Sequence, residues 1–231
     1  NAKNYNRNRN GSAGIYRCAL ISLSNRKGRG LHSMQKELDY FMIEHSYGGN
    51  QEWFWDPMMK IGGCAAVTAC DSSIYFDCYK GTEGLYPYEK TALTKKDYVK
   101  FGMKMKPYLK PRRTGIDSLD IYMDGFGKYL ADKGCDAVHM EPLHGTEDAE
   151  KAKAAVIDAI DRGVPVPCLV LKHENPLFEN YVWHWFLLTG YDTAGDSCMV
   201  KAVTFGESKW LDMDDLWNTG HDKKGGMILY K

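Results

Sequence analysis

The sequence lacks an excess of charge of either sign. Lys plus Arg and Asp plus Glu each number 30 in the 231 residues, so the formal net charge is zero. A neutral chain has no overall field to attract nucleic acid or an anionic membrane, and we expect neither as a partner. The most basic stretch, Lys104–Arg113, contains two prolines and is typical of a solvated connection.

Long apolar runs are also missing. No stretch approaches the ~18 apolar residues of a membrane-spanning helix, so we expect no membrane span. Residues 1–14 are polar and rich in Asn, and they lack the apolar core of a signal peptide. The chain starts with Asn-Ala rather than Met, and we expect it to be trimmed. These features favour a cytoplasmic over a secreted protein, and nothing in them indicates an oligomeric state.

No two cysteines have the Cys-x-x-Cys spacing of a zinc knuckle. Their odd number, in a chain of this length, also disfavours a disulfide framework. We therefore expect no metal, no cofactor, and mostly ordinary buried thiols. The seven cysteines are Cys18, Cys64, Cys70, Cys78, Cys135, Cys168 and Cys198.

Hydrophobic residues make up 44% of the chain and aromatic residues 13%, which is enough for a real core. After a flexible lead at 1–14, we expect one domain over 15–231, with helices crowded into 31–162 and strands into 163–231. Such segregation predicts an α+β fold, with a helical part packed on a C-terminal antiparallel sheet. Helices are predicted at 31–44, 64–76, 95–105, 117–133 and 147–162, and strands at 135–142, 164–172, 181–191, 197–205 and 225–230.

Two glycines stand directly before a cysteine in Gly62–Gly63–Cys64, and an alanine-rich segment follows. This pattern predicts a helix that begins at Cys64. Free N–H groups and the helix dipole at such an end favour the reactive thiolate. The glycines are interpreted as clearance for a substrate backbone. Cys64 is therefore a candidate nucleophile, whereas Cys70, inside the same helix, is predicted to be a core thiol.

A histidine interrupts a strand that is apolar on both alternating faces. The strand is Tyr181–Tyr191, the histidine is His184, and the pattern predicts a central strand covered on both sides. The polar loop Asp192–Asp196 predicts a hairpin. With its turn centred near Ala194, paired residue numbers sum to about 388, so His184 faces Thr204 within a residue or two.

Five motifs occur in an order that resembles the papain-like cysteine peptidase superfamily. The resemblance is closest to its bacterial branch related to the bacteriocin-leader-processing (double-glycine) peptidases, and it covers about residues 31–217. It implies a papain-like fold. The motifs are Asn50–Pro57, Gly63–Ala66, Leu130–Gly134, Ala159–Val166 and His184–Asp192.

The resemblance also implies roles for individual residues. Cys64 would be the nucleophile and His184 the base. The Gln51 side-chain amide would bind the substrate oxyanion together with the Cys64 backbone N–H, and Asn50 is the alternative for that role.

Two positions depart from the family pattern. Ala65–Ala66 follows the cysteine where the family often has Gly-Pro. Thr204 stands where the family usually has Asp or Asn after the histidine. Thr204 can accept a hydrogen bond from the imidazole but supplies no countercharge, although cysteine enzymes tolerate a neutral third member. Asp192 lies too far along the strand to replace it.

The leading hypothesis is thus a cysteine peptidase that hydrolyses a peptide or protein substrate through an acyl-enzyme. An acyl or amide transferase would use the same chemistry with an amine in place of water. A third hypothesis is a catalytically weakened papain-fold binding module, in which the aromatic segments Trp53–Trp55 and Trp210–Trp217 hold a ligand. A histidine close to the sulfur favours catalysis, whereas a cleft plugged by side chains favours the module.

Overall fold

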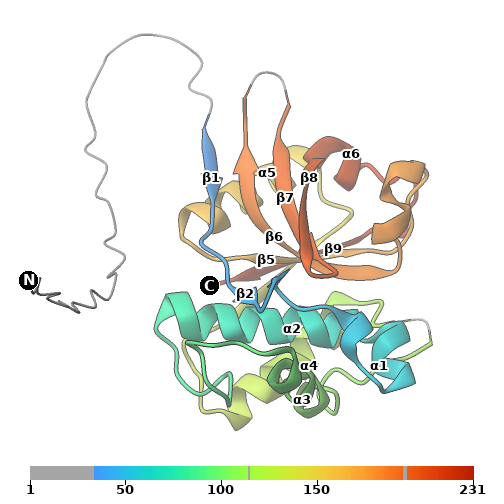
Figure 1. The fold of residues 1–231 in the computed structure, drawn as a ribbon. Helices are drawn as coiled ribbons and strands as arrows, with labels where there is room; N and C mark the ends of the chain where they lie inside the picture. The colour runs from blue at the N-terminus through green and yellow to red at the C-terminus, as the bar shows by residue number, and fades with distance from the viewer. Residues whose placement is uncertain (1–33, 114, 195–196) are drawn as a thin grey trace, which may run out of the picture. The chain divides into compact units, whose positions relative to one another are not determined.

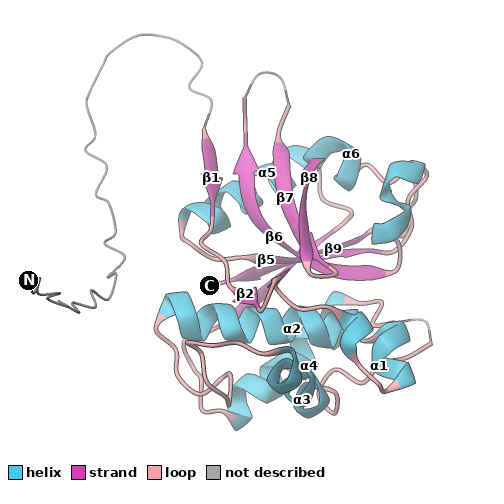
Figure 2. Ribbon diagram, in the orientation of Figure 1, coloured by secondary structure: helices cyan, strands magenta, loops and turns pink. Residues whose placement is uncertain are grey.

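In the part of the chain that the structure describes, helices flank an antiparallel sheet on both faces, with the larger group of helices on one side (Figures 1 and 2). The computed structural model describes residues 34–113, 115–194 and 197–231, which belong to one compact unit. This arrangement confirms the predicted α+β class. The predicted lead at 1–14 lies outside the described residues, as does the start of the predicted domain at 15–33.

The bounds of the elements follow the chain. The helices are α1 Pro57–Gly62, α2 Cys64–Tyr75, α3 Lys95–Met105, α4 Leu119–Asp132, α5 Ala149–Asp161 and α6 Met213–Trp217, with 3-10 turns η1 Gln51–Trp53 and η3 Pro176–Tyr181 and a π-helical turn η2 Phe76–Lys80. The strands are β1 Gln35–Glu37, β2 Met42–Ile43, β3 Ser46–Tyr47, β4 Met140–His144, β5 Val166–Val170, β6 His184–Asp192, β7 Met199–Thr204, β8 Glu207–Asp212 and β9 Gly225–Tyr230.

The main sheet has seven strands, in the order β4-β9-β5-β6-β7-β8, with β1 paired to the end of β6. All of its pairings are antiparallel. Strand β6 is buried from His184 to Tyr191, as its apolar pattern on both faces predicted. Strands β1, β2 and β3 come from the part of the chain where only one strand, at 135–142, was expected, so the division near residue 162 is not strict.

Helix α2 lies between the sheet and the helices α3 and α4 (Figure 1), and it contacts β6 and α3. Eleven of its 12 residues are buried, so it has no solvent face. Its alanines favour helix and let neighbouring elements approach closely. Helix α5 contacts β1, β5, β6 and β9 from the opposite face of the sheet. The sheet is therefore covered on both sides where β6 runs.

The predicted helix at 31–44 is wrong over its described residues, which form β1, a connection and β2. The apolar residues have helical spacing, but Gln35–Glu37 pairs with Gly190–Asp192 of β6 instead. Tertiary pairing overrides a weak local preference there. The strand predicted at 135–142 begins only at Met140, and β8 was not predicted.

The other helices and strands appear close to their predicted positions. Helix α3 has the predicted bounds, and α4 and α5 end just before Gly134 and Gly163, which have φ values of 65° and 74°. This left-handed conformation is the usual stop signal of a helix. Among the described residues, no helix has both the length and the apolar character needed to cross a bilayer.

Helix α5 offers a direct test of its predicted start. The Asp148 side chain accepts a hydrogen bond from the Lys151 backbone N–H at 2.7 Å. Replacing Asp148 with Ala should lower the free energy of unfolding by about 1 kcal/mol, measured by urea denaturation. The control is Asp158→Ala on the same helix, which removes an exposed ion pair with Arg162 and should change stability by less than about 0.5 kcal/mol. Equal losses in both variants would contradict the capping role.

Candidate functional site

Cys64 is the first residue of α2, as the sequence predicted. Gly63 ends α1 and begins α2: its N–H donates to the Met59 carbonyl at 3.0 Å, and its own carbonyl accepts from Val67 at 2.9 Å. The backbone N–H groups of Cys64 and Ala65 have no helical partners at this end of the helix, and they lower the pKa of the Cys64 thiol. The thiol therefore lies where a helix terminus favours negative charge.

The two glycines before Cys64 have a different purpose from the one predicted. A Cβ on Gly62 would lie 2.5 Å from the Arg112 carbonyl oxygen, and a Cβ on Gly63 would lie 2.2 Å from that of Met59. Both positions therefore exclude side chains because protein backbone occupies the space. The interpretation of the glycines as clearance for a substrate is wrong. They allow α1, α2 and the segment near Arg112 to pack closely.

Burial decides the charge of the thiol. The pKa of Cys64 is raised above its ordinary value, because desolvation outweighs the lowering by the N–H groups of Trp185, Ala65 and Cys64 itself. The side chain is only 4% exposed. The helix terminus contributes as predicted, but it does not lower the pKa overall. At neutral pH Cys64 is a protonated thiol.

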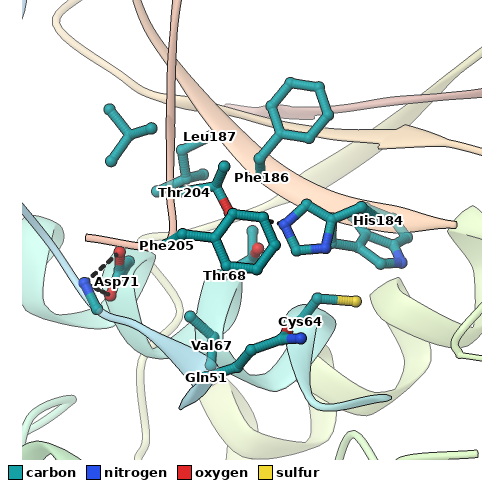
Figure 3. A pocket seen from close by; sticks show the side chains of 13 residues that line it. Gln51, Cys64, Val67, Thr68, Asp71, His184, Phe186, Leu187, Thr204 and Phe205 are labelled. Carbon is teal, nitrogen blue, oxygen red and sulfur yellow. Dashed lines mark hydrogen bonds between the residues drawn. The ribbon is translucent and has the colours of Figure 1, made fainter. Parts of the chain in front are cut away.

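His184 begins β6 and lies in the same pocket as Cys64 (Figure 3). The N–H of Trp185, the next residue, lowers the pKa of Cys64, and α2 packs against β6. His184 Nε2 lies 2.6 Å from Thr204 Oγ1. Figure 3 shows the second ring nitrogen, Nδ1, on the side of the imidazole that faces Cys64.

The partner of His184 is the one that the hairpin predicted. The observed register pairs Leu187 with Val203, so paired numbers sum to 390 rather than about 388, and an irregularity follows Leu188. Thr204 is therefore a diagonal neighbour of His184 and reaches Nε2 with its side chain. Asp192 lies at the other end of β6 and accepts a hydrogen bond from Ala194 N–H.

The imidazole of His184 is neutral as well. Its side chain is 6% exposed, and burial lowers its pKa to about 4. The Phe205 ring stacks on it with centroids 4.5 Å apart and 7° between the planes. An apolar ring on the imidazole disfavours the charged form. The pair therefore rests as thiol and imidazole and not as an ion pair.

Phe205 was missed by the sequence analysis. It has a φ of 53° and forms the turn between β7 and β8 together with Gly206, which has a φ of 79°. Positive φ is unfavourable for a bulky residue. The surroundings offset the strain, because the Phe205 carbonyl accepts from Asn50 Nδ2 at 2.7 Å and the Gly206 carbonyl accepts from Tyr47 N–H at 2.8 Å. The turn that carries Phe205 is thus held by the β3–η1 segment.

Gln51 lines the pocket beside Cys64 (Figure 3). Its Nε2 donates one N–H to the Lys60 carbonyl at 3.2 Å, and an amide nitrogen carries a second N–H. Its Oε1 is buried and has no hydrogen-bond partner among the described residues. An unmet polar atom in a pocket usually marks a place where water or a ligand binds. Asn50, in contrast, uses both ends of its amide, on Phe205 and on Glu52 N–H at 2.8 Å.

The pocket is narrow. The space enclosed by Cys64, His184, Gln51, Thr204 and their neighbours is about 10 Å³, enough for roughly one water molecule. A larger hollow of about 490 Å³ adjoins it and shares Thr204 and Phe205 as lining residues. Phe205 therefore lies between the reactive groups and the nearest open space.

The other cysteines and the possible metal ligands lie in ordinary surroundings. The six cysteines among the described residues are free thiols; Cys70, Cys168 and Cys198 are buried as predicted, whereas Cys78 is exposed and Cys135 is half-buried. Cys18 lies outside the described residues. Among the described residues, no group of three His, Cys, Asp or Glu side chains is placed to hold a metal.

The aromatic segments are mostly part of the core. Phe54 and Trp217 are buried, and Trp53 packs edge-on against Tyr98. Trp55 is 95% exposed and is the exception.

Comparison of the chain with family models, curated proteins and solved structures finds no match. The chemistry of the site therefore has to be argued from its own geometry.

The neutral state of His184 predicts a pH effect on stability. Its pKa is about 4 in the folded protein, against an ordinary value of 6.5 for an exposed histidine, so the unfolded chain binds the proton more tightly. As pH falls from about 6.5 to about 4, wild type should lose about 3 kcal/mol of stability relative to His184→Gln. Urea unfolding of both proteins across this range measures the difference, and other titrating groups cancel. If the free energies of unfolding of the two proteins depend on pH in the same way, burial does not shift the pKa of His184.

Proposed function

We propose that this protein is a papain-like cysteine peptidase, with Cys64 as nucleophile and His184 as base. The observation that carries the proposal is the meeting of four side chains in one pocket. The helix α2 supplies Cys64, strand β6 supplies His184, strand β7 supplies Thr204, and the turn η1 supplies Gln51. These four elements come from different parts of the sequence. In the proposal they supply the nucleophile, the base, the group that orients the base and an oxyanion donor, which acyl transfer requires.

The proposed reaction begins from the neutral pair. In the proposed tautomer, His184 Nε2–H donates a hydrogen bond to the Thr204 hydroxyl, and Nδ1, on the side of Cys64, carries no proton. As the sulfur attacks the amide carbonyl, Nδ1 takes the thiol proton. The imidazolium then gives this proton to the leaving amine, and a thioester remains. Water, deprotonated by the same nitrogen, attacks the thioester and releases the acid and the thiol.

Charge on the carbonyl oxygen is stabilised by two donors in the proposal. One is the Cys64 backbone N–H, which has no helical partner because Cys64 is the first residue of α2. The other is the second N–H of Gln51 Nε2. Loss of one oxyanion donor costs on the order of 100-fold or more in rate. Asn50 supports this arrangement indirectly, since its amide fixes the turn at Phe205.

Substrate entry requires a side chain to move, because the pocket holds about 10 Å³ of free space. Phe205 is the side chain between the reactive groups and the larger hollow. The leaving amine must lie next to His184 to receive its proton. The hollow beside Thr204 and Phe205 is therefore on the leaving-group side of the bond that is cut.

A non-catalytic binding module of the same fold is the second candidate. The small free space of the pocket favours it, as do the raised pKa of Cys64 and the lowered pKa of His184, which both oppose a reactive ion pair. The exposed Trp55 would then contact the ligand. The two candidates differ in one respect that experiment can decide, which is whether His184 activates Cys64.

The decisive experiment is alkylation of the full chain by iodoacetamide, followed by peptide mapping and intact-mass analysis. The exposed Cys78 serves as an internal reference, a thiol that does not contact His184. A peptidase should show alkylation of Cys64 that falls about 10-fold or more in His184→Ala, because the base no longer takes the thiol proton. Alkylation of Cys78 should stay the same. Hydrolysis of casein should disappear in Cys64→Ala and persist in Cys70→Ala.

A Cys64 that reacts equally with and without His184, or does not react at all, would exclude the peptidase. The binding module would then be the better account of the site.

The role of Thr204 is tested by Thr204→Val, which keeps the shape of the side chain and removes the hydrogen-bond acceptor. The rate of Cys64 acylation by p-nitrophenyl acetate should fall about 10-fold, because a single hydrogen bond no longer orients the imidazole. Thr189→Val on β6, the strand that carries His184, is the matched control, since Thr189 is buried but bonds only weakly, to the Lys201 carbonyl at 3.5 Å. A similar loss in both variants would mean that packing, and not orientation, is responsible.

A further inference from the structure

A buried carboxylate lies two turns along α2 from Cys64. Asp71 is 5% exposed and accepts hydrogen bonds from three groups. The Gly49 backbone N–H lies 3.2 and 3.1 Å from its two oxygens, Tyr98 Oη lies 2.6 Å from Oδ1, and Tyr40 Oη lies 3.1 Å from Oδ2. Among the ion pairs of the described residues, none includes Asp71. Its charge is therefore held by hydrogen bonds alone.

Asp71 connects the segment that carries Gln51 to the helix that carries Cys64. It lies on the helix that begins with Cys64, seven residues and ~10 Å further along. Gly49, which it binds, is two residues before Gln51. Both Asp71 and Gly49 line the same pocket as Cys64 and Gln51 (Figure 3). A bond between Asp71 and Gly49 thus fixes the approach of the Gln51 turn to the Cys64 helix.

The glycines before Gln51 are required by this contact. A Cβ on Gly49 would lie 1.8 Å from Tyr98 Oη and 2.7 Å from Asp71 Oδ1, so no side chain fits. Gly48 has a φ of 77°, a conformation that side chains disfavour. In the fold, the pair lets the backbone come within bonding distance of the carboxylate.

We infer that Asp71 is a positioning residue: its carboxylate holds the Gly48–Gln51 segment on α2 and thereby fixes the Gln51 amide beside Cys64. The expected effect of Asp71 on catalysis rests on the proposed function. Its expected effect on the position of Gln51 rests on the contacts alone. Asp71 touches no substrate. It acts through Gly49 on the group that binds the oxyanion.

The same contacts predict a pH dependence. Burial raises the pKa of Asp71 to about 6, although the bonds from Tyr98, Gly49 and Tyr40 lower it. The other titratable groups around it are Cys70 on α2, and Tyr47 and Tyr75 around Tyr40; burial raises the pKa values of Cys70 and Tyr75. Above about pH 6 the carboxylate accepts strong charge-assisted bonds, and below it the neutral acid accepts weaker ones. Protonation of Asp71 therefore loosens the Gln51 segment before His184 titrates at about 4.

The test compares two reactions of the same thiol in wild type and Asp71→Asn. Acylation of Cys64 by p-nitrophenyl acetate passes through an oxyanion: sulfur bonds to the carbonyl carbon and p-nitrophenolate leaves. Alkylation by iodoacetamide displaces iodide and forms no oxyanion. Asp71→Asn should slow acylation about 10-fold or more and change alkylation less than about 3-fold. The fall of the wild-type acylation rate near pH 6 should be missing in the variant.

Two tyrosine variants provide matched controls. Tyr98→Phe removes the shortest bond to Asp71 and should lower acylation in the same selective way. Tyr230→Phe removes a bond of 2.9 Å to Ser72, the next residue of α2, and should leave both reactions unchanged. If acylation and alkylation fall together in Asp71→Asn, or if neither changes, the inference is overturned.

A wild-type Cys64 that reacts with neither reagent would defeat the proposed function, and NMR then decides the inference. The Gly49 amide proton should titrate near pH 6 in wild type and not in Asp71→Asn. The Gln51 side-chain amide should exchange faster in the variant. Unchanged resonances for both groups would show that Asp71 does not position this segment.

Discussion

The burial of helix α2 on all sides is the constraint on which the rest of this structure depends. The helix passes between the sheet and the other helices, so each of its faces has to match a neighbour (Figure 1). One of its faces packs against β6, the strand that begins with His184, next to the N-terminal Cys64 in the same pocket. Its middle carries Asp71, which has to find hydrogen bonds because a buried charge without them is costly. The same helix therefore positions Cys64 directly and, through Asp71, the segment that carries Gln51.

Strain is concentrated beside the site and is held there by long-range bonds. Trp183 and Phe205, next to His184 and Thr204, both have positive φ values, 54° and 53°. Such backbone conformations persist only where surrounding contacts over-determine them. Asn50 provides one of these contacts at Phe205. The hydrogen bond between His184 and Thr204 thus depends on a turn that is clamped from a segment 155 positions earlier in the chain.

Burial also sets the electrostatics of the proposed reaction. It raises the pKa of Cys64 and lowers that of His184 to about 4, so each change favours the neutral form. Proton transfer in the proposed mechanism is therefore coupled to attack on the substrate. A neutral partner such as Thr204 is consistent with this pair, since no resting imidazolium needs a countercharge. The same burial makes the displacement of Phe205 the central physical requirement of the proposal.

The sequence by itself determined the local features around the site. Small residues after a glycine pair predicted the helix that begins at Cys64, and a buried strand followed by a polar loop predicted the contact between His184 and Thr204. Both follow from short-range periodicity and hairpin geometry. Only the tertiary structure decided the rest. Gln35–Glu37 became a strand because β6 offered it an edge, the glycines before Cys64 proved to serve backbone packing, and Asp71 found Gly49, Tyr98 and Tyr40 from three other segments. Such partners are set by which surfaces meet in space, and no local pattern in the chain encodes that.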